Sequence, residues 1–154
     1  MTATEIMSFE DMLNIHGYIA YTCTGFSMLP LLRQNRDIVI INLTGRERCK
    51  KYDVVLYKCK QEYILHRILK VCPNDYVLCG DHNIRREYGI TDKQILGVMT
   101  QIIRDGKSIY PTDWKYKLYV HLWCDFYYVR AVIFHVKLVV RALGRRLKQL
   151  SSGK

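Results

Sequence analysis

A single serine stands in an apolar segment near the start of the chain. Ser27 lies in CTGFSMLPLL, with Gly25 two residues before it and Pro30 three residues after it. A serine hydroxyl is a weak nucleophile near neutral pH unless a base lies within hydrogen-bond reach. Taken alone, such a serine is a structural residue, so a nucleophilic role depends on finding that base.

His66 is the histidine best suited to be the base. It stands in YILHRILK, where strand alternation puts Ile64, His66 and Ile68 on one face. Partial desolvation among isoleucines keeps an imidazole neutral and able to accept a proton. The alternative is a histidine that is hydrogen-bonded to the backbone and has no chemical role. The other histidines lie at an element boundary, in a loop or in the C-terminal segment: His16, His82, His121 and His135.

A carboxylate that could orient this histidine lies in CGDHNIRREYGI. Gly80 and Asp81 form a turn directly after an apolar run, so the Asp81 carboxylate can hold a nearby imidazole in the required tautomer. An Asx turn within a tight loop explains the same aspartate equally well. Both interpretations stay open on spacing alone.

The elements that must position these residues are mostly short strands. A capping box at residues 8–11 predicts a short helix that ends near Ile15. Strands are predicted at 18–24, 36–43, 52–59, 62–71, 75–80 and 95–104, with turn residues between them. No helical pattern separates the strands, which favours a mainly β fold, a small antiparallel rolled sheet or barrel. The chain is thus divided into an N-terminal helical segment (1–17), a β domain (18–110) and a C-terminal segment (111–154).

The C-terminal segment is predicted to form one long helix that starts near Thr112 and Asp113. Its uncharged runs are too short to cross a bilayer, and Arg130 and Lys137 would lie at mid-membrane depth. Its tyrosines, tryptophans and basic end suit the surface of an anionic membrane. Packing on the domain or on a partner protein is the open alternative.

Composition narrows the class of protein. The 154 residues carry a formal net charge of +10, which favours an anionic partner such as a membrane surface, nucleic acid or an acidic substrate. No secretory signal peptide opens the chain, so the six cysteines are expected to be reduced and mostly buried, and the protein to be cytoplasmic or membrane-associated. Cys79 and His82 lack two further ligands at fitting spacing, so neither a metal nor a cofactor is expected.

The order of these motifs resembles the type I signal peptidase family. The blocks TGFSMLPLLRQNRDIVIIN, KKYDVVLYK, YILHRILKV, YVLCGDHNIRREYGI and ILGVMTQIIR follow one another over about residues 18–104. The wider resemblance is to the serine peptidase clan that also contains self-cleaving repressors. Most bacterial members have lysine where this chain has His66, so the resemblance is to the Ser–His subtype of the endoplasmic reticulum, archaea and spore-formers.

The resemblance implies a serine endopeptidase that cleaves a signal or leader peptide, with Ser27 as nucleophile and His66 as general base. In that subtype the later box runs GDNN and ends in an Asp pair. Here it runs GDHN, and the pair falls at Arg86 and Glu87, so Asp81 and Glu87 both stay candidates for the third member.

The substrate would lie as an extended strand beside the sheet, with small residues before the cut. Gly25 lets the chain turn tightly, and Met28 and Pro30 would shape the floor of the substrate site. Backbone N–H groups near Ser27 would bind the oxyanion.

Two other functions compete with this one. A non-catalytic relative could bind peptides or membranes through the same sheet. A self-cleaving DNA-binding regulator would need an upstream helix-turn-helix, for which residues 1–17 are too short. It would also need a cleavage site ahead of the serine, and no Ala-Gly or Cys-Gly pair precedes Ser27. We therefore expect no nucleic-acid partner.

Overall fold

The computed structural model describes residues 7–45, 47–125, 132–133, 136 and 140. The chain forms two compact units, residues 1–118 and 119–154. Within its described residues, the first unit contains one helix, then eight strands and one 3-10 turn, and then the start of a second helix. Its elements before that helix are α1 (Phe9–His16), β1 (Tyr18–Thr22), β2 (Ile38–Leu43), β3 (Val54–Cys59), β4 (Glu62–Val71), β5 (Tyr76–Cys79), β6 (Glu87–Ile90), η1 (Asp92–Gln94), β7 (Ile95–Arg104) and β8 (Lys107–Ile109).

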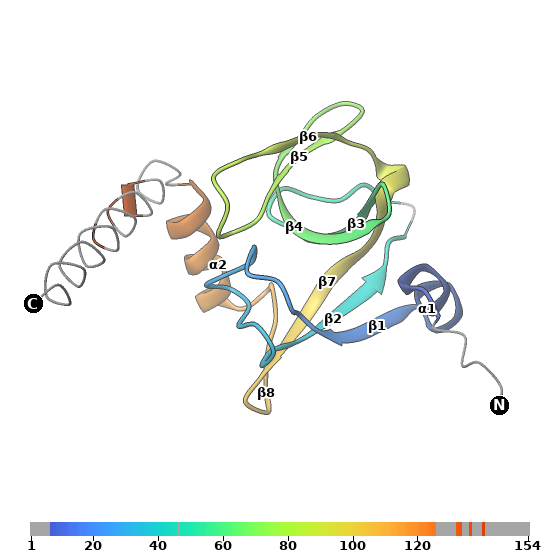
Figure 1. Ribbon diagram of the computed structural model, residues 1–154, viewed down its shortest axis with the longest axis horizontal. Coiled ribbons are helices and arrows are strands. Elements are labelled where there is room, and N and C mark those ends of the chain that lie inside the picture. Colours follow the sequence, from blue (N-terminus) through green and yellow to red (C-terminus); the bar gives the residue numbers. More distant parts are fainter. Residues whose placement is uncertain (1–6, 46, 126–131, 134–135, 137–139, 141–154) are drawn as a thin grey trace, which may run out of the picture. The chain divides into compact units, whose positions relative to one another are not determined.

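The strands form one open antiparallel sheet in the order β1-β2-β7-β3-β4-β5-β6, with β8 paired to β7. The long strand β7 runs between β2 and β3 (Figure 1). The predicted mainly antiparallel β architecture is confirmed, and all six predicted strands are present. The sequence analysis missed β6 and β8, because each is only three or four residues long and too polar to show a clear alternation.

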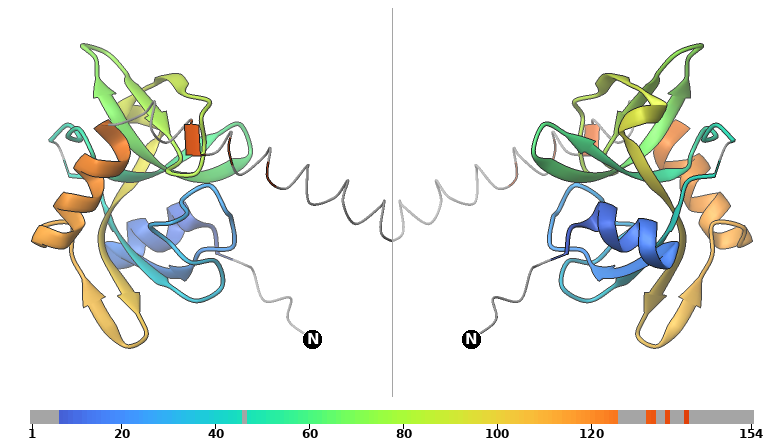
Figure 2. Two further views of the ribbon diagram at one scale, coloured as in Figure 1. Left: turned by 90° about the vertical axis from the view of Figure 1, so that its left-hand side faces the viewer. Right: turned by 90° about the vertical axis from the view of Figure 1, so that its right-hand side faces the viewer.

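The N-terminal helix is the one that the capping box predicts. The Ser8 hydroxyl accepts a hydrogen bond from the Asp11 N–H (3.1 Å), and the Asp11 carboxylate accepts one from the Ser8 N–H (3.3 Å). The helix ends at Gly17, whose positive φ of 76° lets its N–H donate to the Leu13 carbonyl (2.8 Å). Figure 2 shows α1 beside β1 and β2, where Leu13 is buried.

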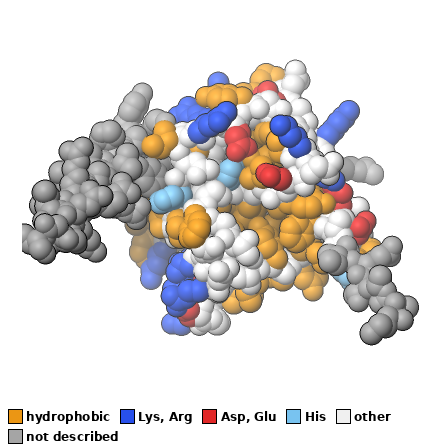
Figure 3. Space-filling model, in the orientation of Figure 1, with side chains coloured by type: hydrophobic (Ala, Val, Ile, Leu, Met, Phe, Trp, Pro, Cys, Tyr) orange, Lys and Arg blue, Asp and Glu red, His pale blue; other side chains and the backbone are white. Residues whose placement is uncertain are grey.

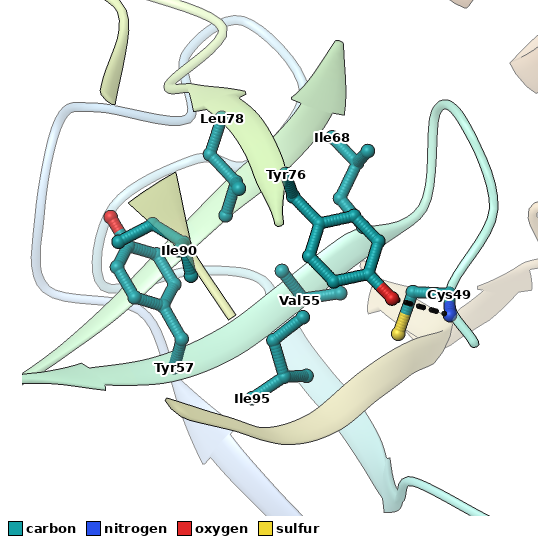
Figure 4. Close-up of a cluster of buried hydrophobic side chains, with 8 residues drawn as sticks. All are labelled: Cys49, Val55, Tyr57, Ile68, Tyr76, Leu78, Ile90 and Ile95. Atoms are coloured by element: carbon teal, nitrogen blue, oxygen red, sulfur yellow. Dashed lines mark hydrogen bonds between the residues drawn. The ribbon is translucent and has the colours of Figure 1, made fainter. Parts of the chain in front are cut away.

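The core next to the candidate site is a cluster of β-branched, aromatic and aliphatic side chains (Figure 4). Its members are Cys49, Val55, Tyr57, Ile68, Tyr76, Leu78, Ile90 and Ile95. Two of them are tyrosines, and a buried hydroxyl needs a partner. The Tyr76 hydroxyl accepts a hydrogen bond from the Cys49 N–H (3.2 Å) and donates to Asp92. The Tyr57 hydroxyl reaches the candidate site instead.

After the sheet come α2 (Trp114–Val120) and a π-helical turn, η2 (His121–Asp125). The start of α2 directly after Asp113 agrees with the predicted helix start. The long helix predicted up to the C-terminus is not shown, because most of it lies outside the described residues. Within the described part, no helix is both long and apolar enough to span a membrane.

Candidate active site

His66 lies in the middle of β4 with its side chain almost fully buried. In the register of the sheet, His66 pairs with Val55 of β3, so Tyr57 is its diagonal neighbour on the same face. The same face continues through Ile68 and Leu78 to Glu87 of β6, because these residues pair across β4, β5 and β6. Three strands therefore bring Tyr57, His66 and Glu87 together.

The contacts of the imidazole are made at Nδ1. This atom lies 3.1 Å from Glu87 Oε1 and 3.2 Å from the Tyr57 hydroxyl. The second carboxylate oxygen of Glu87 accepts a hydrogen bond from the Tyr57 hydroxyl. A carboxylate can only accept, so the neutral ring carries its proton on Nδ1 and donates it to Glu87. The lone pair is then on Nε2, which is the nitrogen that a general base needs.

Burial lowers the pKa of His66 below its ordinary value, although the charges of Glu87 and Asp81 act in the opposite direction. The lowered pKa keeps the imidazole neutral at pH 7, which is the state that accepts a proton. The nearby Glu87 carboxylate stabilises the imidazolium once the proton has been taken.

Ser27 lies in a turn after β1, and a close backbone contact brings this turn against the loop that follows β5. Its carbonyl oxygen accepts a hydrogen bond from the His82 N–H (2.7 Å). A methyl group on Gly80 would lie 2.5 Å from that oxygen and 3.0 Å from His66 Nε2. Only glycine permits this approach. Gly80 is thus the point at which the serine turn and the lone-pair side of the histidine meet.

The Ser27 hydroxyl makes no hydrogen bond to His66, whose hydrogen-bonding contacts within residues 7–45 and 47–125 are those with Tyr57 and Glu87. The turn is closed by the Leu29 N–H, which donates to the Phe26 carbonyl (3.1 Å). The N–H groups of Ser27 and Met28 have no backbone acceptor among the described residues. They are the donors that could bind an oxyanion beside the serine.

Asp81, in the turn after β5, is hydrogen-bonded to a different side chain of β4. Its two carboxylate oxygens accept hydrogen bonds from Arg67 Nε (2.9 Å) and Nη2 (2.7 Å), and both side chains are fully buried. Arg67 Nη1 also donates to the Tyr52 carbonyl (2.9 Å) and to the Tyr116 hydroxyl of α2 (3.0 Å). The Asp81 carboxylate therefore neutralises a buried arginine, whereas Glu87 contacts the imidazole.

Strand alternation explains this division between the two acids. His66 and Arg67 are consecutive, so their side chains leave opposite faces of β4. Arg67 pairs with Cys79, and Asp81 is two residues further along the same face. Glu87 pairs with Leu78, which belongs to the face of His66. The sequence analysis left the choice between Asp81 and Glu87 open because the pairing of β4 with β5 and of β5 with β6 is not readable from one sequence.

The other predicted site residues lie around the serine turn. Met28 is fully buried beneath the turn, while Gly25 and Pro30 are exposed. The sequence analysis did not identify Tyr57 or Asn83, whose Nδ2 would lie 2.9 Å from a methyl group on Gly80. Tyr57 lies two residues from the residue of β3 that pairs with His66. The sequence could therefore have pointed to Tyr57 only if the pairing of these two strands had been known.

The structure describes the six cysteines as free thiols, four of them buried. No cluster of three or more metal-ligating side chains occurs among the described residues. A search against protein-family models finds no match for the chain, and neither does a search of the curated proteins.

Proposed function

We propose that this chain is a serine endopeptidase in which Ser27 is the nucleophile and His66 the general base. The observation that supports the proposal best is the orientation of the imidazole. Glu87 accepts the Nδ1 proton, and Nε2 lies at Gly80 together with the backbone of Ser27. A nucleophile, a base and an orienting carboxylate arranged in this way have the roles of a catalytic triad.

The reaction proceeds in two halves. The Ser27 oxygen attacks the peptide carbonyl while His66 Nε2 takes the hydroxyl proton, and the N–H groups of Ser27 and Met28 bind the resulting oxyanion. The intermediate collapses when His66 gives that proton to the leaving amine, which breaks the peptide bond and leaves an acyl-enzyme. A water that His66 deprotonates then releases the acid and regenerates Ser27.

The substrate that we propose is a signal or leader peptide bound as an extended strand. Figure 3 shows hydrophobic side chains gathered on the face where β1, β2 and β7 lie, and Phe26, next to the serine, is 61% exposed. Such a surface suits an apolar peptide segment. The resemblance of the sequence blocks to type I signal peptidases, and the presence of the six strands in the predicted order, support a fold of that family.

A library of internally quenched peptides with Ala, Gly or Ser before the cut tests the proposal. The wild-type chain is expected to cleave some of them, Ser27→Ala to cleave none, and His66→Ala to be slower by about two orders of magnitude or more. Exposed Ser108 of β8 is a matched control, since Ser108→Ala removes a serine hydroxyl far along the sheet. Cleavage that survives Ser27→Ala unchanged would exclude Ser27 as the nucleophile.

A non-catalytic peptide-binding relative is the second candidate. The Ser27 hydroxyl is not hydrogen-bonded to His66, and a protein that only binds peptides would not need this hydrogen bond. The same hydrogen bond is, however, often absent from peptidases without substrate. Peptides that bind the wild-type chain and Ser27→Ala equally, with no cleavage by either, would establish this function instead.

We also propose that α2 contacts an anionic membrane surface. Tyr116 is buried, but Trp114 and Leu118, four residues apart, are 69% and 50% exposed, and Lys115 and Lys117 are exposed as well. Flotation with vesicles that contain an anionic lipid should carry the chain upward, and less so the Trp114→Gln/Leu118→Gln variant. Ile15→Gln removes an exposed apolar residue from α1 and serves as the control. Equal flotation of all three proteins would contradict a role for α2.

A further inference from the structure

Tyr57 is one of two tyrosines in the buried cluster, and its hydroxyl lies between the two ionisable members of the site. The side chain is fully buried. Its oxygen lies 3.2 Å from His66 Nδ1, and it donates its proton to Glu87. A hydroxyl has one proton to donate, so toward His66 the same oxygen is an acceptor. Tyr57 therefore completes a ring of three contacts with the imidazole and the carboxylate.

The partial exposure of Glu87 gives this ring its importance. The Glu87 side chain is 32% exposed, whereas that of His66 is only 5% exposed. A partly exposed glutamate can turn toward water, which would leave the Nδ1 proton of the buried imidazole without its carboxylate acceptor. The hydrogen bond from Tyr57 holds one carboxylate oxygen so that the other faces Nδ1. Burial and the Glu87 carboxylate raise the pKa of Tyr57, so the hydroxyl keeps its proton at any pH at which the site works.

We propose that Tyr57 is a positioning residue that acts through Glu87: its hydroxyl fixes the carboxylate that orients His66. The inference rests on the proposed peptidase function for its kinetic consequence, but the contact itself can be tested without catalysis. The ionisable groups that act electrostatically on His66 or Tyr57 are Glu87 from β6, Asp81 from the loop after β5 and the thiols of Cys59 and Cys79. Of these, only Glu87 is hydrogen-bonded to both Tyr57 and His66.

A double-mutant cycle of Tyr57→Phe and Glu87→Gln separates this role from a packing role. If Tyr57 acts through Glu87, the hydroxyl has nothing left to position once the carboxylate is gone, so the double variant should match Glu87→Gln. Tyr57→Phe alone should lower kcat on the order of tenfold, the effect of one hydrogen bond to a charged group. Tyr76→Phe removes a hydroxyl from the same cluster at a place remote from His66 and should leave kcat unchanged.

The titration of the His66 ring by NMR, recorded in the Ser27→Ala background, tests the contact independently of any substrate. Tyr57→Phe should shift the pKa of His66 downward, in the same direction as Glu87→Gln, because Glu87 raises that pKa. An unchanged titration, or effects of the two substitutions that add in the double variant, would overturn the proposal. If the wild-type chain cleaves nothing while the NMR shifts occur as described, the peptidase function fails and the positioning contact stands.

Discussion

Amide substitution of the two acids of the candidate site should affect different properties, stability for Asp81 and catalysis for Glu87. Asp81→Asn removes one partner of a fully buried ion pair and leaves the Arg67 guanidinium without its counter-charge. Breaking such a pair typically costs about 3–5 kcal/mol. For a domain of this size, each kcal/mol lowers Tm by about 3–5 °C, so we expect a fall of about 9–25 °C. The main effect of Asp81→Asn should thus be on stability.

Glu87→Gln should affect catalysis instead. The side chain is partly exposed, and the loss of its hydrogen bond with the neutral His66 should cost about 1 kcal/mol of stability or less. Without the carboxylate, the imidazolium that forms during the attack by Ser27 loses its counter-charge, and the Nδ1 tautomer is no longer enforced. We expect kcat to fall by about 100-fold or more.

Thermal unfolding followed by circular dichroism, and peptide hydrolysis measured well below the lowest Tm, give the two quantities. Glu62→Gln removes an exposed carboxylate from the start of β4 and is the control for loss of charge alone. The reasoning is refuted if Asp81→Asn keeps its Tm but loses hydrolysis while Glu87→Gln remains active. Asp81 would then be the acid that orients His66.

Three further predictions follow from contacts in the same unit. Burial holds the pKa of His66 below its ordinary value of about 6.5, so hydrolysis should fall only when the pH drops below that value. In Glu87→Gln, which removes a group that raises the pKa, the acidic limb of the kcat/KM profile should move to lower pH. Gly80→Ala should reduce hydrolysis strongly at an unchanged substrate dissociation constant, because its methyl group would displace the Ser27 backbone; wild-type rates would contradict the close approach. Ser8→Ala should lower the free energy of unfolding in urea by about 1 kcal/mol with normal hydrolysis, because it removes only the α1 cap.

Local patterns were sufficient to predict six of the eight strands described and the first helix. The apolar alternation around His66 belongs to one strand, and the capping box of Ser8 and Asp11 spans four residues, so both are readable from neighbouring positions. The choice of the third acid depends on how β4, β5 and β6 are aligned, and a shift of one residue reverses which side chains share a face. Tyr57 was not identified for the same reason, since its contact with His66 joins two neighbouring strands and depends on their register.

Because His66 and Arg67 are consecutive and face opposite ways, the number of residues in β4 cannot change without exchanging their positions. His66 contacts Glu87, whereas Arg67 is hydrogen-bonded to Asp81 and Tyr116 on the opposite face of the strand. An insertion or deletion of a single residue just before this pair would place the Arg67 guanidinium on the side of Glu87 and the His66 imidazole on the side of Asp81. Both sets of contacts would then be lost. Length changes are thus expected to be tolerated in the hairpins that flank this strand but not within it.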